Sequence, residues 1–106
     1  MFVALYEMEA KLGHEAEFEQ AWADVTKAIL RVQGSLGSRL HTTCRPGHYI
    51  AYAQWPSDQV FDENKIDPGF STSEAEAFER MKSSASSIKL LHRLNVRSDL
   101  LKLVKA

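Results

Sequence analysis

Residues 38–55 read SRLHTTCRPGHYIAYAQW, a pattern that predicts two antiparallel strands joined by a tight turn. Residues 44–47, Cys-Arg-Pro-Gly, have turn chemistry, so residues 38–43 and 48–55 are the two strands. With this turn, Thr43 pairs with His48 and His41 pairs with Ile50. One face then carries the mostly apolar set Leu40, Thr42, Tyr49, Ala51, Ala53 and Trp55. The other face carries the mixed set Arg39, His41, Thr43, His48, Ile50, Tyr52 and Gln54. We expect helices to pack on the first face, because its alanines allow close approach.

Upstream of this hairpin, the chain predicts a strand and then a long helix. Residues 2–10 alternate as a strand, with Phe2, Ala4, Tyr6 and Met8 on one face. Residues 14–33 carry apolar side chains three and four apart, which places one apolar stripe on a helix: Phe18, Trp22, Val25, Ile29 and Val32. Gly34 follows as the expected C-terminal cap.

Downstream, the pattern predicts a helical turn, a second main helix and a last strand. Pro56 and Ser57 can begin a turn that runs through Phe61, and residues 64–70 are expected to form a loop. Ser71 and Ser73 each precede a Glu by three residues, the spacing of a capping box. The following helix is marked by Ala77, Phe78, Met81 and Ala85. Residues 88–96 then predict a strand that presents one face made of Leu90, His92, Leu94 and Val96.

The predicted element order is β-α-β-β-α-β over a single domain, residues 1–106. This is the ferredoxin-like arrangement of the α+β class, a four-stranded antiparallel sheet with both helices on one face. The opposite face carries Ile50 and Tyr52 among polar side chains. In so small a domain, we expect a homodimer that stacks these open faces.

Composition narrows the function classes. Thirteen basic and fourteen acidic residues give a net charge of -1, which argues against nucleic-acid binding. The single cysteine, Cys44, cannot form an internal disulfide, which favours a reducing, cytoplasmic setting. The apolar runs are too short to cross a bilayer, so no membrane partner is expected.

Four short motifs follow one another along the chain. They are the run 34–40 after the long helix, the strand 49–57 that ends in Trp-x-Ser, the Ser-x-Ala opening of the second helix, and Asp99-Leu100-Leu101 after the last strand. Together they resemble the antibiotic biosynthesis monooxygenase domain of the dimeric α/β-barrel superfamily, over nearly the whole chain.

The resemblance implies a homodimer of face-to-face sheets, with a pocket between sheet and helices in each subunit. It also implies a reaction of dioxygen with an electron-rich phenolic or quinol-type substrate, without metal or flavin cofactor. Similar proteins degrade haem and place an Asn in the first strand, a His in the second helix and a Trp near the end of the third strand. Trp55 matches that Trp, whereas Tyr6 and Lys82 stand at the other two positions. Haem degradation therefore ranks below oxygenation of a quinol or polyketide-like aromatic.

Six side chains are candidates for substrate binding: Trp55, Tyr6, Tyr49, His92, Trp22 and Phe78. An indole ring would form a flat wall against an aromatic ligand. Tyrosine and histidine tips would help to remove a proton and to stabilise an oxyanion. Each candidate also has an ordinary alternative role as a packed residue of the core.

Other chemistry finds less support. His41, Cys44 and His48 lack the spacing of a zinc site, so no metal is expected. No phosphate-binding loop, dinucleotide fingerprint or nucleophile elbow is present. The main alternative to the monooxygenase is a non-catalytic dimeric domain that binds a small ligand or has a structural role. The enzyme hypothesis requires a closed pocket of several hundred Å³, lined by Trp55 and at least two inward polar side chains.

Overall fold

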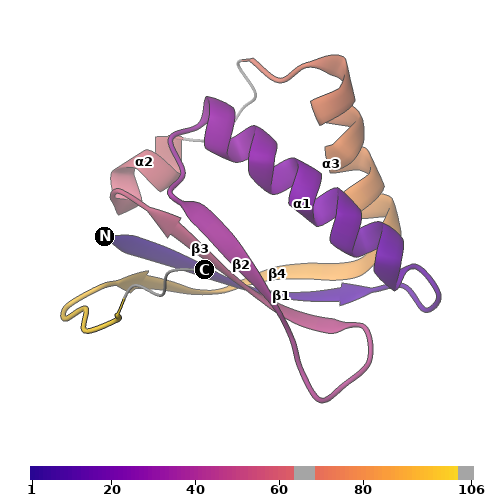
Figure 1. Ribbon diagram of the computed structural model, residues 1–106, viewed down its shortest axis with the longest axis horizontal. Helices are drawn as coiled ribbons and strands as arrows, with labels where there is room; N and C mark the ends of the chain where they lie inside the picture. Colours follow the sequence, from indigo (N-terminus) through magenta and orange to yellow (C-terminus); the bar gives the residue numbers. More distant parts are fainter. Residues whose placement is uncertain (64–68, 103–106) are drawn as a thin grey trace.

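A computed structural model describes residues 1–63 and 69–102, which form one antiparallel sheet and three helices. The elements in chain order are β1 (Phe2–Ala10), α1 (Glu15–Val32), β2 (Gly37–Thr42), β3 (His48–Trp55), α2 (Asp58–Glu63), α3 (Thr72–Ser84) and β4 (Ala85–Asn95). The strand order is β2-β3-β1-β4. Helices α1 and α3 cover one face of the sheet, and α2 lies at its end beside the N-terminus (Figure 1). The predicted ferredoxin-like fold is confirmed, with α2 as the predicted helical turn.

The central hairpin has the predicted register. His41 pairs with Ile50 and Thr42 pairs with Tyr49 across the β2–β3 ladder. Gly47 takes a left-handed φ of 73° in the connecting turn, a conformation that glycine adopts without a Cβ penalty. Burial alternates along β3, and its four buried side chains are those of the predicted helix-facing set: Tyr49, Ala51, Ala53 and Trp55. The strand period therefore places the small alanines beneath the helices.

The two long helices are fixed by the predicted stripe and cap. Helix α1 buries Phe18 and Val25 of the predicted stripe together with Ala21 and Ala28, and Gly34 beyond its end has a φ of 74°. Helix α3 begins with a capping box, in which the Ser71 hydroxyl accepts from the Glu74 amide and the Glu74 carboxylate accepts from the Ser71 amide. The same Glu74 carboxylate binds the Arg31 guanidinium, which ties the start of α3 to the end of α1.

Strand β4 corrects two predictions. It begins at Ala85, three residues earlier than expected, so Ala85 belongs to the strand and not to α3. A β-bulge also lies at Leu91, because Tyr6 pairs with Leu90 whereas Leu5 pairs with His92. Because of this extra residue, each side chain of β4 after Leu91 lies on the sheet face opposite to the predicted one. The prediction that Leu90, His92 and Leu94 share a face is therefore wrong, and His92 shares the helix-free face with Leu5.

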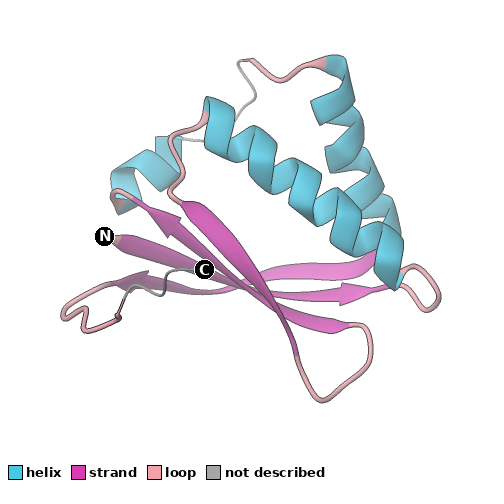
Figure 2. Cartoon of the chain, viewed as in Figure 1, coloured by secondary structure: helices cyan, strands magenta, loops and turns pink. Residues whose placement is uncertain are grey.

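The layers of the molecule are a helical layer and a sheet with one uncovered face (Figure 2). One buried cluster comprises Phe2, Ala4, Ala53 and Trp55, and a second comprises Met8, Phe18, Tyr49 and Ala51. They lie at opposite ends of the same helix-facing surface. Within the described residues, no helix combines the length and apolar character needed to cross a membrane.

Candidate active site

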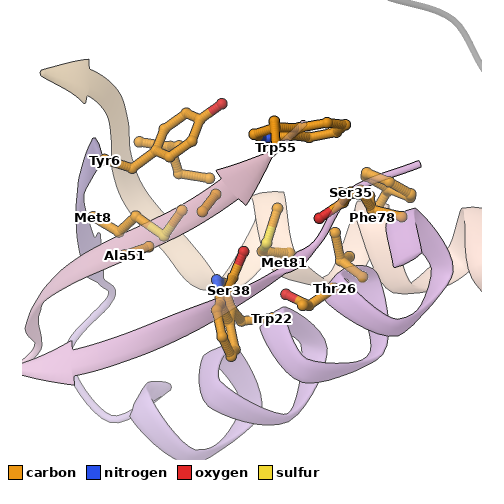
Figure 3. Close-up of a pocket in the computed structure, with 14 residues that line it drawn as sticks. Tyr6, Met8, Trp22, Thr26, Ser35, Ser38, Ala51, Trp55, Phe78 and Met81 are labelled. Carbon is orange, nitrogen blue, oxygen red and sulfur yellow. The ribbon is translucent and has the colours of Figure 1, made fainter. Parts of the chain in front are cut away.

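A cavity of about 220 Å³ lies between the helical layer and the sheet. The sheet contributes seven lining residues: Tyr6, Met8, Ser38, Ala51, Ala53, Trp55 and Ile88. The helices and the segment after α1 contribute the other seven: Trp22, Val25, Thr26, Ile29, Ser35, Phe78 and Met81. The strand alanines Ala51 and Ala53 line the cavity on the sheet side, beneath the helices (Figure 3).

Trp55 closes one end of the cavity with an unpaired hydrogen-bond donor. Its side chain is only 5% exposed, and its ring meets Phe61 of α2 edge-on at a centroid distance of 5.4 Å. The indole Nε1 is buried and has no hydrogen-bond partner in the structure. Leaving such a donor unsatisfied costs about 1–3 kcal/mol. A ligand oxygen that reached this N–H would supply the missing acceptor.

Tyr6 lies beside Trp55 at the same end of the cavity (Figure 3). Burial raises the pKa of the Tyr6 phenol, and the nearby Arg93 guanidinium partly offsets this by lowering it. The phenol therefore stays neutral at physiological pH and can donate a hydrogen bond. Arg93 itself bonds the Asp62 carboxylate through both terminal nitrogens, at 2.9 Å each. Its guanidinium also lies 5.2 Å from the centroid of the Phe2 ring.

Three hydroxyl side chains complete the polar lining: Thr26, Ser35 and Ser38. Figure 3 shows Thr26 and Ser38 across the cavity from Tyr6 and Trp55. The Ser35 hydroxyl accepts from the Gly37 amide at 2.9 Å, which orients it within the connection from α1 to β2. Every other lining side chain is apolar or a half-buried indole, so the cavity is an apolar space with hydrogen-bonding groups at two ends.

The structure brings four of the six candidate residues together. Trp55, Tyr6, Trp22 and Phe78 all line the cavity. The cavity is lined by Trp55 and by polar side chains, as the enzyme hypothesis requires, but its volume of about 220 Å³ is below the several hundred Å³ expected.

The other two candidates, Tyr49 and His92, do not line the described cavity. The Tyr49 ring packs at 5.1 Å from that of Phe18, and its hydroxyl donates to the Glu19 carboxylate at 2.6 Å. His92 lies on the opposite face of the sheet because of the bulge. The expectation that its side chain points towards the helices is wrong.

The residues that sequence reasoning missed are the three hydroxyls. Thr26 follows Trp22 by one helical turn, so the helix period could have placed both on one side of α1. Ser35 and Ser38 occupy an irregular connection and the start of an edge strand, where periodicity carries little information. Ser35 lies in the connection between α1 and β2, and Ser38 lies in β2 itself.

The residues around the hairpin turn, His41, Cys44 and His48, are not arranged as a metal site. His41 Nδ1 lies 2.9 Å from the Ile50 carbonyl oxygen, and His48 Nε2 lies 2.8 Å from a Glu7 carboxylate oxygen. Cys44 is exposed in the turn. Throughout residues 1–63 and 69–102, no three His, Cys, Asp or Glu side chains are arranged to hold a metal ion.

Comparison with known protein families identifies the family of this chain. The family model described as "antibiotic biosynthesis monooxygenase" matches residues 1–72, which include β1, the central hairpin and Trp55. The chain belongs to this family. The predicted resemblance is thereby confirmed. None of the curated protein sequences compared with the chain matches it.

Several solved structures share the fold of this chain. A variant of SnoaB, a cofactor-independent oxygenase from Streptomyces nogalater, aligns with a TM-score of 0.73 and 17% identity, covering 95% of this chain and 97% of SnoaB. MhuD, a haem degrader from Mycobacterium tuberculosis solved with two haems in its active site, aligns with a TM-score of 0.69 and 25% identity, covering 94% and 99%. Proteins that share this fold therefore differ in their chemistry.

Proposed function

We propose that the protein is a cofactor-independent monooxygenase that acts on a small aromatic substrate of the quinol or polyketide type. The observation that carries the proposal is Trp55, which lines the mostly apolar cavity and whose buried Nε1 donor has no partner among the described residues. The cofactor-independent oxygenase SnoaB shares the fold, which is consistent with this chemistry.

The cavity offers what such a reaction requires of the protein. An electron-rich substrate must carry developing negative charge on oxygen before it can transfer an electron to dioxygen. In this proposal the neutral donors Trp55 Nε1 and Tyr6 Oη stabilise that oxyanion. The apolar walls hold the ring and exclude water. In the overall reaction one oxygen atom enters the substrate, and the other leaves as water with two substrate hydrogens.

The second candidate is non-catalytic binding of the same class of ligand. The described lining contains no carboxylate, imidazole or amine that could act as a base. Proton removal would then depend on the acidity of the substrate itself. A substrate that is not already acidic would be bound without reacting.

Haem degradation, the chemistry of MhuD, fits this cavity poorly. The chain has four histidines, and none of them lines the described cavity, so no imidazole is placed there to ligate a haem iron. The cavity of about 220 Å³ is also below the ~300 Å³ at which pockets for drug-sized ligands begin. We therefore do not assign a haem to it.

Oxygen uptake with a panel of quinols tests the monooxygenase. Trp55→Phe removes the N–H and retains an aromatic ring, and Tyr6→Phe removes only the hydroxyl. We expect each substitution to lower kcat/KM by about tenfold or more, since each removes one donor to the oxyanion. Tyr52→Phe makes the same change as Tyr6→Phe on the opposite face and should leave uptake unaltered. Uptake that neither cavity substitution changes would overturn the site, and binding without uptake would favour the second candidate.

We further propose that a second copy of the chain covers the open face of the sheet. This face carries half-buried Leu5, Ile50 and Tyr52 and the 42% exposed Leu94. Apolar side chains on an uncovered sheet face in a small domain favour association with a like surface.

A further inference from the structure

The described lining of the cavity contains no formally charged side chain. Its polar groups are two indoles, the Tyr6 phenol and three hydroxyls, all of them neutral. Trp55 Nε1 can only donate a hydrogen bond, whereas the phenol and the hydroxyls can also accept one. The cavity therefore recognises oxygen atoms through hydrogen bonds alone.

Two arginines on elements that line the cavity, Arg93 of β4 and Arg31 of α1, already have anionic partners. Arg93 holds Asp62 with two hydrogen bonds, and Arg31 holds Glu74 and the Gly69 carbonyl oxygen. Neither arginine lines the cavity. A carboxylate that entered would lose its hydration and would find no unpaired cation in the described lining, so its binding would be weakened.

We infer that this cavity selects uncharged aromatic ligands of one or two rings that carry oxygen substituents, and rejects carboxylated or phosphorylated aromatics of the same size. The inference rests on the proposed role of the cavity as the substrate site. It adds a rule of selection by charge that depends on the neutral lining, not on whether the ligand is then oxidised.

The arrangement of the polar groups also limits the ligand's shape. Tyr6 and Trp55 lie at one side of the cavity, and Thr26 and Ser38 lie across it (Figure 3). Between them are the alanines and the Met8 and Met81 side chains, which suit a flat ring. A ring system with an oxygen at each end satisfies both groups. The volume of about 220 Å³ leaves no room for a large polycyclic or tetrapyrrole ligand.

Intrinsic fluorescence can test the inference directly, because both tryptophans of the chain line the cavity. The probes are a hydroxynaphthoic acid and its methyl ester, which share a ring system and differ in charge. The ester is the larger of the two, so weaker binding of the acid cannot be attributed to size. We expect the ester to bind at least about tenfold more tightly than the acid at neutral pH, a difference of ~1.4 kcal/mol.

A cation placed in the lining should reverse this selection. Met81→Lys introduces an ammonium at the cavity wall, and Met81→Leu is the matched neutral control. We expect the lysine variant to gain about tenfold in affinity for the acid with little change for the ester, and the leucine variant to retain the wild-type preference. Thermal unfolding of both variants shows whether the fold is retained. If the lysine variant does not fold, the wild-type comparison of acid and ester still decides.

The outcomes separate this inference from the proposed function. Equal affinity of the wild type for acid and ester would overturn charge selection even if quinol oxidation is observed. Preference for the ester without any oxygen uptake would overturn the monooxygenase and leave charge selection intact. Failure of both probes to bind would contradict the inference as well, because the cavity would then take no such aromatic.

Discussion

At the scale of single residues, Tyr49 shows how the fold holds an ionisable group in one state. Burial, followed by the hydrogen bond to Glu19, raises the Tyr49 pKa from 10.0 to about 12. A raised pKa means that folding favours the protonated phenol. This contribution to stability is complete below pH 10 and is lost as the pH rises through about 12.

Tyr49→Phe tests this linkage. The free energy of unfolding of the wild type should fall as the pH is raised from 10 towards 12, and the variant should lack this part of the decline. At neutral pH the variant should be less stable by about 1 kcal/mol, the usual value of one hydrogen bond. Urea unfolding at neutral pH measures the loss of the hydrogen bond, and urea unfolding between pH 10 and 12 measures the pH-dependent decline in stability. Parallel pH profiles for the two proteins would contradict the assignment.

The residues of the cavity also show what sequence can predict at this scale. Alternation along a strand determined the faces of Trp55 and Tyr6, because a strand has a side-chain period of two. It placed Tyr49 on the correct face as well, but could not show that Glu19, thirty residues away, accepts its hydroxyl proton in a hydrogen bond. Whether a helix-facing side chain borders a cavity or fills the core depends on what packs opposite, and that is a property of the tertiary structure.

At the scale of elements, the sequence was a reliable guide to helices and strands and a poor one to irregularities. The apolar stripe predicted α1, and turn chemistry predicted the register of the hairpin. No feature of the sequence predicts the bulge at Leu91, because Leu90, Leu91 and His92 are typical of a regular strand. One unpaired residue was enough to move His92 to the opposite face.

The start of α3 yields a prediction at the same scale. The hydrogen bond from Arg31, followed by that from the Ser71 amide, lowers the Glu74 pKa from 4.5 to about 2. A lowered pKa means that the charged carboxylate stabilises the fold. This stabilisation is present above pH 4.5 and is lost as the pH falls towards 2.

Glu74→Gln should therefore lower the melting temperature at neutral pH and have a smaller effect near pH 2, where the wild type has itself lost the interaction. Glu76→Gln is the control, since Glu76 is an exposed glutamate of the same helix at the cap spacing from Ser73. Melting followed by circular dichroism at the two pH values gives the comparison. If Glu74→Gln lowered the melting temperature equally at neutral pH and near pH 2, the ionised carboxylate would be excluded as the cause.

At the scale of the whole molecule, the order of the elements was enough to predict the architecture. Two helices that each follow a strand must cover one side of the sheet, and the other side is left without a covering layer. On that side Leu94 stands 42% exposed, beside a shallow groove that includes Val3 and Tyr52. A second copy would remove this apolar surface from water.

The proposed dimer should sediment at twice the 12.0 kDa mass of the chain at micromolar concentration. Leu94→Glu places a charge on the open face, and burial of that charge without a partner should weaken association by about a hundredfold or more. Leu12→Glu makes the same change in the connection between β1 and α1, where Leu12 is 95% exposed, and should leave association unaltered. The cavity lies on the other face of the sheet. If each subunit carries a complete site, ligand binding by the monomeric Leu94 variant should still change its tryptophan fluorescence. A wild-type chain that sediments as a compact monomer would show instead that the open face is stable in water.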